Sequence, residues 1–274
     1  MNPKITTQKI ALVAIFTALF YVLSLIAPIK IPTTVGTIEI NFAALIASIF
    51  GLVLGPYLGA TAALLGSSVT WALTGMSPYG LPFVIAPMFN ALITGLIFYK
   101  KWKYAFVIFA IMIIAFLFTP PVTPLTGQSS LIGFNVPINN WYIALAVLFD
   151  KVIALAIILP LAFFGKKMSV AYGSAFFFLL SFVGNQADNM WGSLAYATPP
   201  VYSTIFQTPL EFVQIAFLAS PFLYPTIRLI QAFIAMIIAV PLIRVLQGTN
   251  WLWSKDNIFS DAQKSLVTIA EVSQ

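Results

Sequence analysis

The feature that most constrains this chain is the depth at which its few polar residues occur within long apolar runs. The chain is 61% hydrophobic and only 7% charged, with a mean hydropathy of +1.00. A polar group in hydrocarbon costs free energy unless it has a partner or lines a wet cavity. Most charges and amides outside the loops fall in the outer half of a predicted membrane span. This clustering at one depth predicts a single polar site that opens toward one side of a membrane.

The apolar runs predict an all-α integral membrane protein, a bundle of about six to eight transmembrane helices. A helix crosses a hydrocarbon core of about 30 Å in about 20 residues. The runs are continuous rather than alternating, which argues against a β-barrel. The second and third spans meet at a tight turn, Gly55-Pro56-Tyr57-Leu58-Gly59, and the fifth is short for a full crossing. The predicted spans are 9–28, 41–58, 59–77, 83–99, 104–119, 141–164, 170–196 and 222–246.

The chain is predicted to contain one transmembrane substrate-binding domain, residues 1–248, followed by a cytoplasmic polar tail, residues 249–274. The first apolar run could be a signal peptide, but it ends at Ala27-Pro28 without a small-x-small cleavage site, so a retained span is the preferred interpretation. Residues 205–220 are apolar with two polar insertions and predict an interfacial or re-entrant helix over the outer face.

The basic residues predict the orientation, because cytoplasmic loops carry the excess of Lys and Arg. With the N-terminus inside, the opposite loops hold only Lys30, while Lys151 and Arg228 lie within spans. Both termini are therefore predicted to be cytoplasmic. The other ten basic residues fall on the cytoplasmic side: Lys4, Lys9, Lys100, Lys101, Lys103, Lys166, Lys167, Arg244, Lys255 and Lys264.

The residue types that are missing exclude several classes of chemistry. The chain has no Cys and no His, which excludes disulfides, thiol catalysis and imidazole metal sites and removes the most common general base. No Walker motif is present, so the chain is not expected to hydrolyse ATP itself. Asp150 and Asp188 remain as a weak candidate dyad for an intramembrane enzyme. We therefore expect no enzymatic activity, no cofactor, no metal and no nucleic-acid partner.

The polar residues of the spans form the candidate binding site. Asn185, Asp188 and Asn189 share one helix face through their i, i+3, i+4 spacing, and Gln186 points elsewhere. Asp150 and Asp188 have possible partners in Lys151 and Arg228. Such residues can also form interhelical hydrogen bonds and ion pairs that only hold a bundle together; a ligand cavity is the favoured interpretation. The candidate substrate-binding residues are Glu39, Asn41, Asn90, Asp150, Asn185, Asp188, Asn189, Trp191 and Arg228.

The stretch from Ala11 to about Lys101 resembles the substrate-binding S component of energy-coupling factor (ECF) transporters. The resemblance is carried by several short motifs, and the C-terminal region also fits it. These motifs are Ala14-x-x-x-Ala18, Ile38-Glu39-Ile40-Asn41, Gly55-Pro56-x-x-Gly59, Lys100-Lys101, Pro225-Thr226-Ile227-Arg228 and Val240-Pro241-Leu242-Ile243.

The resemblance implies a high-affinity, membrane-embedded subunit of an ABC importer for a vitamin, cofactor precursor or similar micronutrient, in a prokaryotic cell membrane. It also implies a separate transmembrane coupling subunit and two cytoplasmic ATPases, with Ala14 and Ala18 as the docking surface for the coupling subunit. The alternative is an independent ion-coupled secondary transporter, in which Asp150 and Asp188 would bind protons or sodium. Against it, the sequence shows no internal repeat of the kind many such transporters contain.

Overall fold

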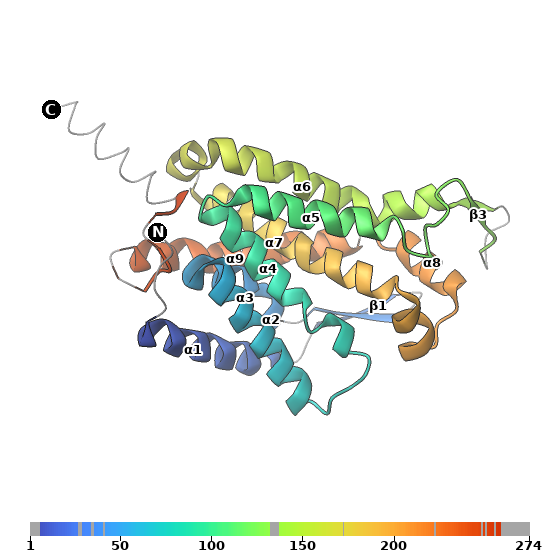
Figure 1. Cartoon of the computed structure of the whole chain (residues 1–274), viewed down its shortest axis with the longest axis horizontal. Helices are drawn as coiled ribbons and strands as arrows, with labels where there is room; N and C mark the ends of the chain where they lie inside the picture. Colours follow the sequence, from blue (N-terminus) through green and yellow to red (C-terminus); the bar gives the residue numbers. More distant parts are fainter. Residues whose placement is uncertain are drawn as a thin grey trace.

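The long apolar runs of the sequence form long helices that lie alongside one another (Figure 1). The computed structural model describes residues 6–26, 29–33, 36–40, 42–131, 137–171, 173–221, 223–247, 249, 251–254 and 256–258. The α-helices are α1 (Thr7–Ser24), α2 (Phe42–Leu45), α3 (Ala47–Leu73), α4 (Ala86–Phe98), α5 (Trp102–Phe116), α6 (Asn140–Ala171), α7 (Gly173–Tyr196), α8 (Leu210–Leu218) and α9 (Leu223–Leu246). A 3₁₀ turn, η1 (Leu81–Phe83), precedes α4, and a π-helical turn, η2 (Pro200–Ile205), follows α7.

Five helical segments in the described part of the chain are long and apolar enough to cross a membrane. Helices α5, α6 and α9 leave large apolar side chains such as Ile111, Phe163 and Phe233 exposed. Such faces are costly in water, whereas hydrocarbon chains solvate them without penalty. The chain is therefore a helical membrane protein with multiple spans. The five segments are Thr7–Ser24, Ala47–Leu73, Leu81–Phe98, Asn140–Ser169 and Tyr224–Leu246.

The second and third predicted spans meet at a break inside α3. The segment consists of two helical stretches joined at Gly55, whose backbone is not helical, and a Cβ at Gly59 would lie 2.5 Å from the Phe50 carbonyl oxygen, so the chain bends sharply there. Gly55 has a φ of +81°, in the left-handed region that glycine adopts without steric cost. The turn predicted at this position is thus confirmed as a kink, while the number of complete crossings stays a prediction.

Pro56 explains why carbonyl groups at this kink accept hydrogen bonds from residues distant in the sequence. Proline has no N–H, so the carbonyl of Leu52, four residues earlier, cannot receive its helical hydrogen bond. The hydroxyl of Tyr99, at the end of α4, donates to that carbonyl at 2.7 Å. The adjacent carbonyl of Val53 accepts from the backbone N–H of Trp253 at 2.9 Å. The kink is therefore completed by two segments far away in the sequence.

Two further differences concern short elements. Helix α5 has 15 residues, about 22 Å at helical rise, so it is shorter than a full crossing. The all-α prediction also missed two small antiparallel hairpins, β1 (Ile29–Thr33) with β2 (Gly36–Ile40), and β3 (Gln128–Ser129) with β4 (Ile138–Asn139). The register of the first hairpin sets Ile29 opposite Ile40 and Ile31 opposite Ile38, a pairing typical of strands, whereas the second hairpin pairs mostly polar residues.

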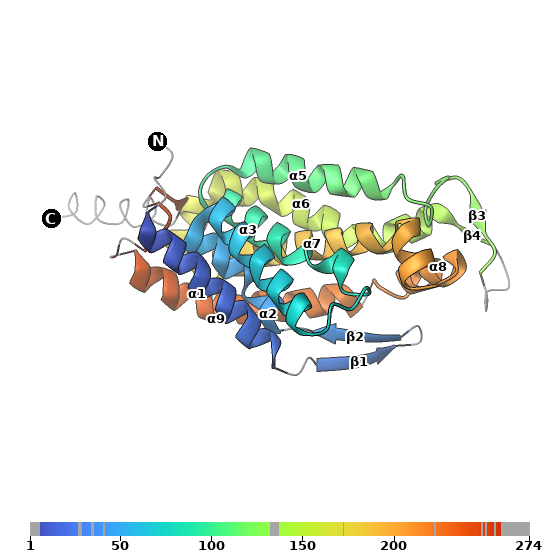
Figure 2. The same ribbon diagram turned by 60° about the horizontal axis from the view of Figure 1, so that its bottom comes forward.

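The two ends of the bundle differ in composition (Figure 2). One end, here named the basic end, holds the start of α1, the C-terminal end of α4 and residues 251–254 and 256–258. Lys9 lies there, because its Nζ donates to the Trp253 carbonyl at 3.2 Å. So does Lys101, whose Nζ lies 5.0 Å from the centre of the Tyr57 ring. The opposite end carries both hairpins and α8. This arrangement agrees with the predicted orientation, which stays a prediction.

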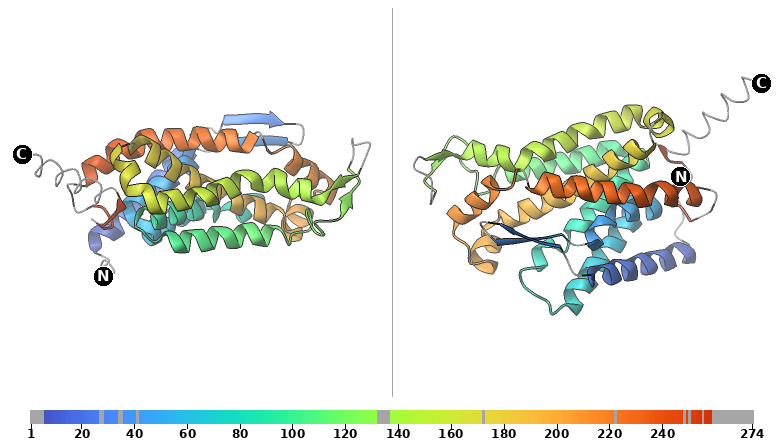
Figure 3. Two further views of the ribbon diagram at one scale, coloured as in Figure 1. Left: turned by 90° about the horizontal axis from the view of Figure 1, so that it is seen from above. Right: turned by 180° about the vertical axis from the view of Figure 1, so that it is seen from behind.

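Helix α7 runs through the middle of the bundle and packs against α4, α6 and α9. Figure 3 shows α9 and the β1–β2 hairpin on one side of the molecule and α5 on the other. Every residue of α7 from Leu180 to Met190 is buried. A helix that is buried all round is normally apolar on every face. The polar residues that α7 carries in this stretch therefore require an explanation.

Candidate functional site

The buried stretch of α7 holds four polar residues, Asn185, Gln186, Asp188 and Asn189. All four side chains are at most 6% exposed. Gly184 allows α4 to approach this stretch closely, because a Cβ at that position would lie 2.1 Å from Thr94 Oγ1. The local sequence thus places amides and a carboxylate where helices meet.

The amide of Asn185 faces α4. Asn90 Nδ2 donates to Asn185 Oδ1 at 3.1 Å, and Thr94 Oγ1 donates to Asn90 Oδ1 at 3.4 Å. All three residues are completely buried. This chain of hydrogen bonds fixes the orientation of Asn185 and joins α4 to α7.

The charged residues of the spans form two ion pairs, as the sequence predicts. Asp188 on α7 lies 3.6 Å from Arg228 on α9, and Asp150 lies 2.9 Å from its neighbour Lys151 on α6. Lys151 and Arg228 are close enough to interact electrostatically. Because each carboxylate has a cationic partner, the group carries no net charge, which lowers the cost of burying it. Gln231 accepts a further hydrogen bond from Arg228 at 2.7 Å.

Several polar atoms of this cluster nevertheless have hydrogen-bonding capacity that the described residues do not use. Buried polar groups are normally paired, and an unpaired one costs about 1–3 kcal/mol. A polar ligand or bound water that donates to and accepts from these atoms would remove that cost. The atoms are Asn185 Nδ2, Gln186 Nε2 and Oε1, Asp188 Oδ2, Asn189 Nδ2 and Arg228 Nε.

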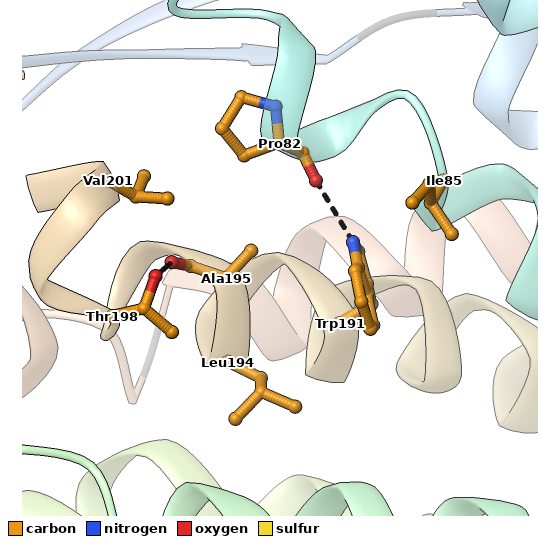
Figure 4. A pocket seen from close by; sticks show the side chains of 7 residues that line it. All are labelled: Pro82, Ile85, Trp191, Leu194, Ala195, Thr198 and Val201. Atoms are coloured by element: carbon orange, nitrogen blue, oxygen red, sulfur yellow. Dashed lines mark hydrogen bonds between the residues drawn. The ribbon is translucent and has the colours of Figure 1, made fainter. Parts of the chain in front are cut away.

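A cavity of about 450 Å³ begins one turn further along α7, at Trp191 (Figure 4). The indole N–H of Trp191 donates to the Pro82 carbonyl at 3.0 Å, and its ring stacks on Phe89 with centroids 5.0 Å apart. The Thr198 hydroxyl donates to the Ala195 carbonyl at 2.7 Å. The walls therefore present an almost entirely apolar surface. The lining residues are Pro82, Ile85, Trp191, Leu194, Ala195, Thr198 and Val201.

An aromatic group borders this cavity at the end of the bundle opposite the basic end. The ring of Phe206 makes edge contacts with Tyr79 and Tyr196, each at 5.3 Å, and with Phe83 at 6.2 Å. Phe206 follows η2, Phe83 belongs to η1 and Tyr196 ends α7. The three elements that supply most of the cavity wall are thus held together by one side chain.

The structure brings most of the predicted site residues together. Asn90, Asp150, Asn185, Asp188, Asn189 and Arg228 lie in the polar cluster on α4, α6, α7 and α9, and Trp191 lines the cavity. Glu39 lies in β2, opposite Lys30 in the strand register, and β2 is not one of the helices that carry the polar cluster. Asn41 lies outside the described residues.

Sequence reasoning missed the apolar part of the site. Ile85, Leu194 and Val201 line the cavity, but in a chain that is 61% hydrophobic such residues carry no distinguishing signal. Pro82 was not expected either, although a proline in a turn before a span can expose a carbonyl to an indole N–H. Ala14 and Ala18 lie on α1, away from the cavity walls, and both are exposed.

This arrangement defines a class of protein: a helical membrane protein whose central helix carries buried polar groups beside a cavity of ligand size. Residues 4–123 match the family described as "ECF-type riboflavin transporter, S component". Over these residues the match confirms the resemblance to S components, the substrate-binding subunits of ECF transporters. No curated protein and no solved structure matches the chain.

Proposed function

We propose that the chain is a high-affinity S component that binds riboflavin, or a closely related planar vitamin, from the outer side of a prokaryotic cell membrane. The observation that carries the proposal is the match of residues 4–123 to the riboflavin transporter S component. The opposite end of the bundle from the basic residues is the side from which the ligand would enter.

The geometry of the site supports a ligand with an apolar ring system and a polar end. Riboflavin combines a planar tricyclic ring with a polyhydroxylated chain. The cavity of about 450 Å³ falls in the range of small-molecule sites, about 300–1,000 Å³, and its lining is apolar. Trp191 offers an aromatic wall to a planar ring. The unpaired amides of Asn185, Gln186 and Asn189 offer hydrogen bonds to carbonyl and hydroxyl groups.

The two ion pairs have a positioning role in this proposal. Asp188 pairs with Arg228, and Asp150 pairs with Lys151. The cluster therefore contains two cationic side chains but carries no net charge. Removing one member of such a pair leaves the other charge uncompensated, which is strongly destabilising. Substitutions of Asp188 would therefore confound binding with folding, and the neutral amides are the better test residues.

Energy coupling would come from other subunits. We propose a transmembrane coupling subunit and two cytoplasmic ATPases, because the sequence contains no Walker motif. Ala14 and Ala18 are exposed on α1 and lie one helical turn apart. Small side chains at this spacing let another helix approach closely, so this face of α1 is the proposed docking surface.

The substrate and the site are tested by equilibrium titration of the purified protein, with quenching of riboflavin fluorescence as the signal. We expect Asn189→Ala and Gln186→Ala to weaken binding five- to 150-fold, which corresponds to the roughly 1–3 kcal/mol of one buried polar contact. Ser174→Ala is the matched control, since Ser174 is an exposed residue at the start of the same helix. Its affinity should equal that of the wild type.

Two results would contradict the proposal in different ways. If the folded wild-type protein does not bind riboflavin, the substrate is wrong. If it binds riboflavin and both amide variants bind equally well, the substrate stands and the cluster is structural. Sustained uptake by the chain alone in liposomes under an ion gradient would instead favour a secondary transporter that uses Asp150 and Asp188.

A further inference from the structure

The residues after α9 pack against the basic end of the bundle. The described part of this segment, residues 251–254 and 256–258, is named here the C-terminal clip. Leu252, Asn257 and Ile258 are buried, whereas Trp251 is 51% exposed. The clip therefore has one side turned to the helices and one turned to solvent, although it begins the region that the sequence predicts to be a polar tail.

Trp253 is the residue that seats the clip in the kink of α3. Its backbone N–H donates to the Val53 carbonyl at 2.9 Å. Its ring fits against Gly55 so closely that a Cβ at position 55 would lie 2.3 Å from the indole. The Tyr99 ring meets the indole edge-on at 4.9 Å, and Lys101 Nζ lies 5.4 Å from the indole centre.

The clip also binds the first turn of α1, ahead of the contacts that Phe16 and Thr17 make with Phe50 and Ala62 of α3. Lys9 Nζ donates to the Trp253 carbonyl at 3.2 Å. Within α1 itself, Leu12 and Phe20 are the buried residues, and most of the helix surface is open. The clip thus connects the basic end of α1 to the kink of α3 and to the end of α4.

The buried side of the clip packs on the bundle, with Ile258 next to Gly165 of α6, while its ion pair with α4's end lies near solvent. Lys100 pairs with Asp256, and these side chains are 37% and 78% exposed. Exposed ion pairs contribute little to stability and are screened by salt. Within the described residues, one backbone hydrogen bond, from Trp253 to Val53, joins the clip to the helices. At the edge of a membrane protein water can replace that bond, so undocking leaves no polar group stranded in hydrocarbon.

We propose that the C-terminal clip is a releasable brace for α1. Docked, it holds the start of α1 against the α3 kink. Undocked, it frees the first turn of α1, around Lys9, while α1 from Phe16 onward stays packed on α3. If α1 docks a coupling subunit through Ala14 and Ala18, a consequence that rests on the proposed function, then clip release and subunit assembly are linked. The brace itself does not depend on the identity of the ligand.

The brace is tested by thiol labelling, since the chain has no cysteine of its own. Leu252→Cys and Ile258→Cys place reporters on the buried side of the clip, and Trp251→Cys places a matched control on its exposed side. In the purified full-length protein we expect both buried reporters to react with a maleimide about tenfold or more slowly than the control, because labelling requires local opening. Equal rates would show that the clip is not docked and would overturn the proposal.

A second step tests release. Asp256→Ala and, separately, Lys9→Ala should each increase the labelling rate of Leu252→Cys about threefold or more, and high salt should do the same for the parent reporter. Trp251→Cys should not change. A buried reporter that stays protected in both variants and in high salt would show a fixed structural element and would also overturn the proposal. Riboflavin titration of the same variants separates this outcome from failure of the proposed function, because the clip variants should bind as the wild type does.

Discussion

Tyr99→Phe tests whether the α3 kink depends on a hydrogen bond from a distant side chain. The substitution removes one oxygen from a residue that is 5% exposed. It keeps the ring, and with it the edge contacts to Phe98 at 5.1 Å and Trp253 at 4.9 Å. The Leu52 carbonyl then has neither the Tyr99 hydroxyl nor a helical donor, because Pro56 has no N–H. The variant therefore removes the donor to the Leu52 carbonyl, together with the acceptor that the hydroxyl offers to the backbone of Ser254 and Trp253.

The loss in the free energy of unfolding follows from leaving the Leu52 carbonyl without a donor. A typical hydrogen bond contributes about 0.5–1.5 kcal/mol, but a buried group left without a partner costs about 1–3 kcal/mol. We expect Tyr99→Phe to lower the free energy of unfolding in detergent by the second amount. Tyr104→Phe is the matched control, because Tyr104 is 65% exposed on α5, and its effect should stay within about 0.5 kcal/mol. Equal stabilities of the two variants would refute the account of the kink.

The pH dependence gives an independent check on the same bond. Burial raises the pKa of Tyr99 above its ordinary value of 10.0. A group whose pKa is raised on folding contributes its stability below the unfolded pKa and loses it as the pH rises through the folded pKa. The difference between wild type and Tyr99→Phe should therefore be constant from about pH 6 to pH 9, and decline only above about pH 10. A decline near neutral pH would contradict the assignment of Tyr99 as the donor.

Two further predictions concern orientation and assembly. Ser130→Cys should react with an impermeant maleimide on intact cells, whereas Lys167→Cys should react only after the membrane is opened. The ten-to-one distribution of basic residues predicts that Lys167 is inside, and the reverse labelling pattern would overturn the orientation. Ala14→Trp combined with Ala18→Trp should abolish co-purification with the coupling subunit and riboflavin uptake, since bulky side chains keep helices apart, while riboflavin binding by the isolated subunit should persist; normal assembly of this variant would exclude that face of α1.

The polar half of the site could be predicted from the sequence because each member has a large energetic consequence in hydrocarbon. Asp150 with Lys151 and Asp188 with Arg228 form the pairs that intramembrane charges require, and the structure confirms both. The spacing of Asn185, Asp188 and Asn189 was likewise readable, since a helix of this length is fixed by its apolar run. Their role in ligand binding stays a prediction.

The apolar half could not be predicted, because its residues have no property that separates them from lipid-facing or packing residues. Ile85 and Val201 come from two loops that the sequence does not place side by side. The break in α3 at Gly55 was predicted from the Gly-Pro pair, but the groups that satisfy the freed carbonyls were not. Here those groups are supplied by Tyr99 and Trp253, which no local pattern could indicate.

The dependence of the α3 kink on Trp253 has a consequence for biosynthesis and for the handling of the protein. The carbonyl of Val53 enters the membrane early, but its partner is translated only when residue 253 leaves the ribosome. The α3 kink therefore cannot take the form seen here until residue 253 has been translated. A deletion that begins before residue 251 would remove the Trp253 hydrogen bond from the kink. Affinity tags and fusion partners belong beyond residue 258, where they leave the seat of Trp253 undisturbed.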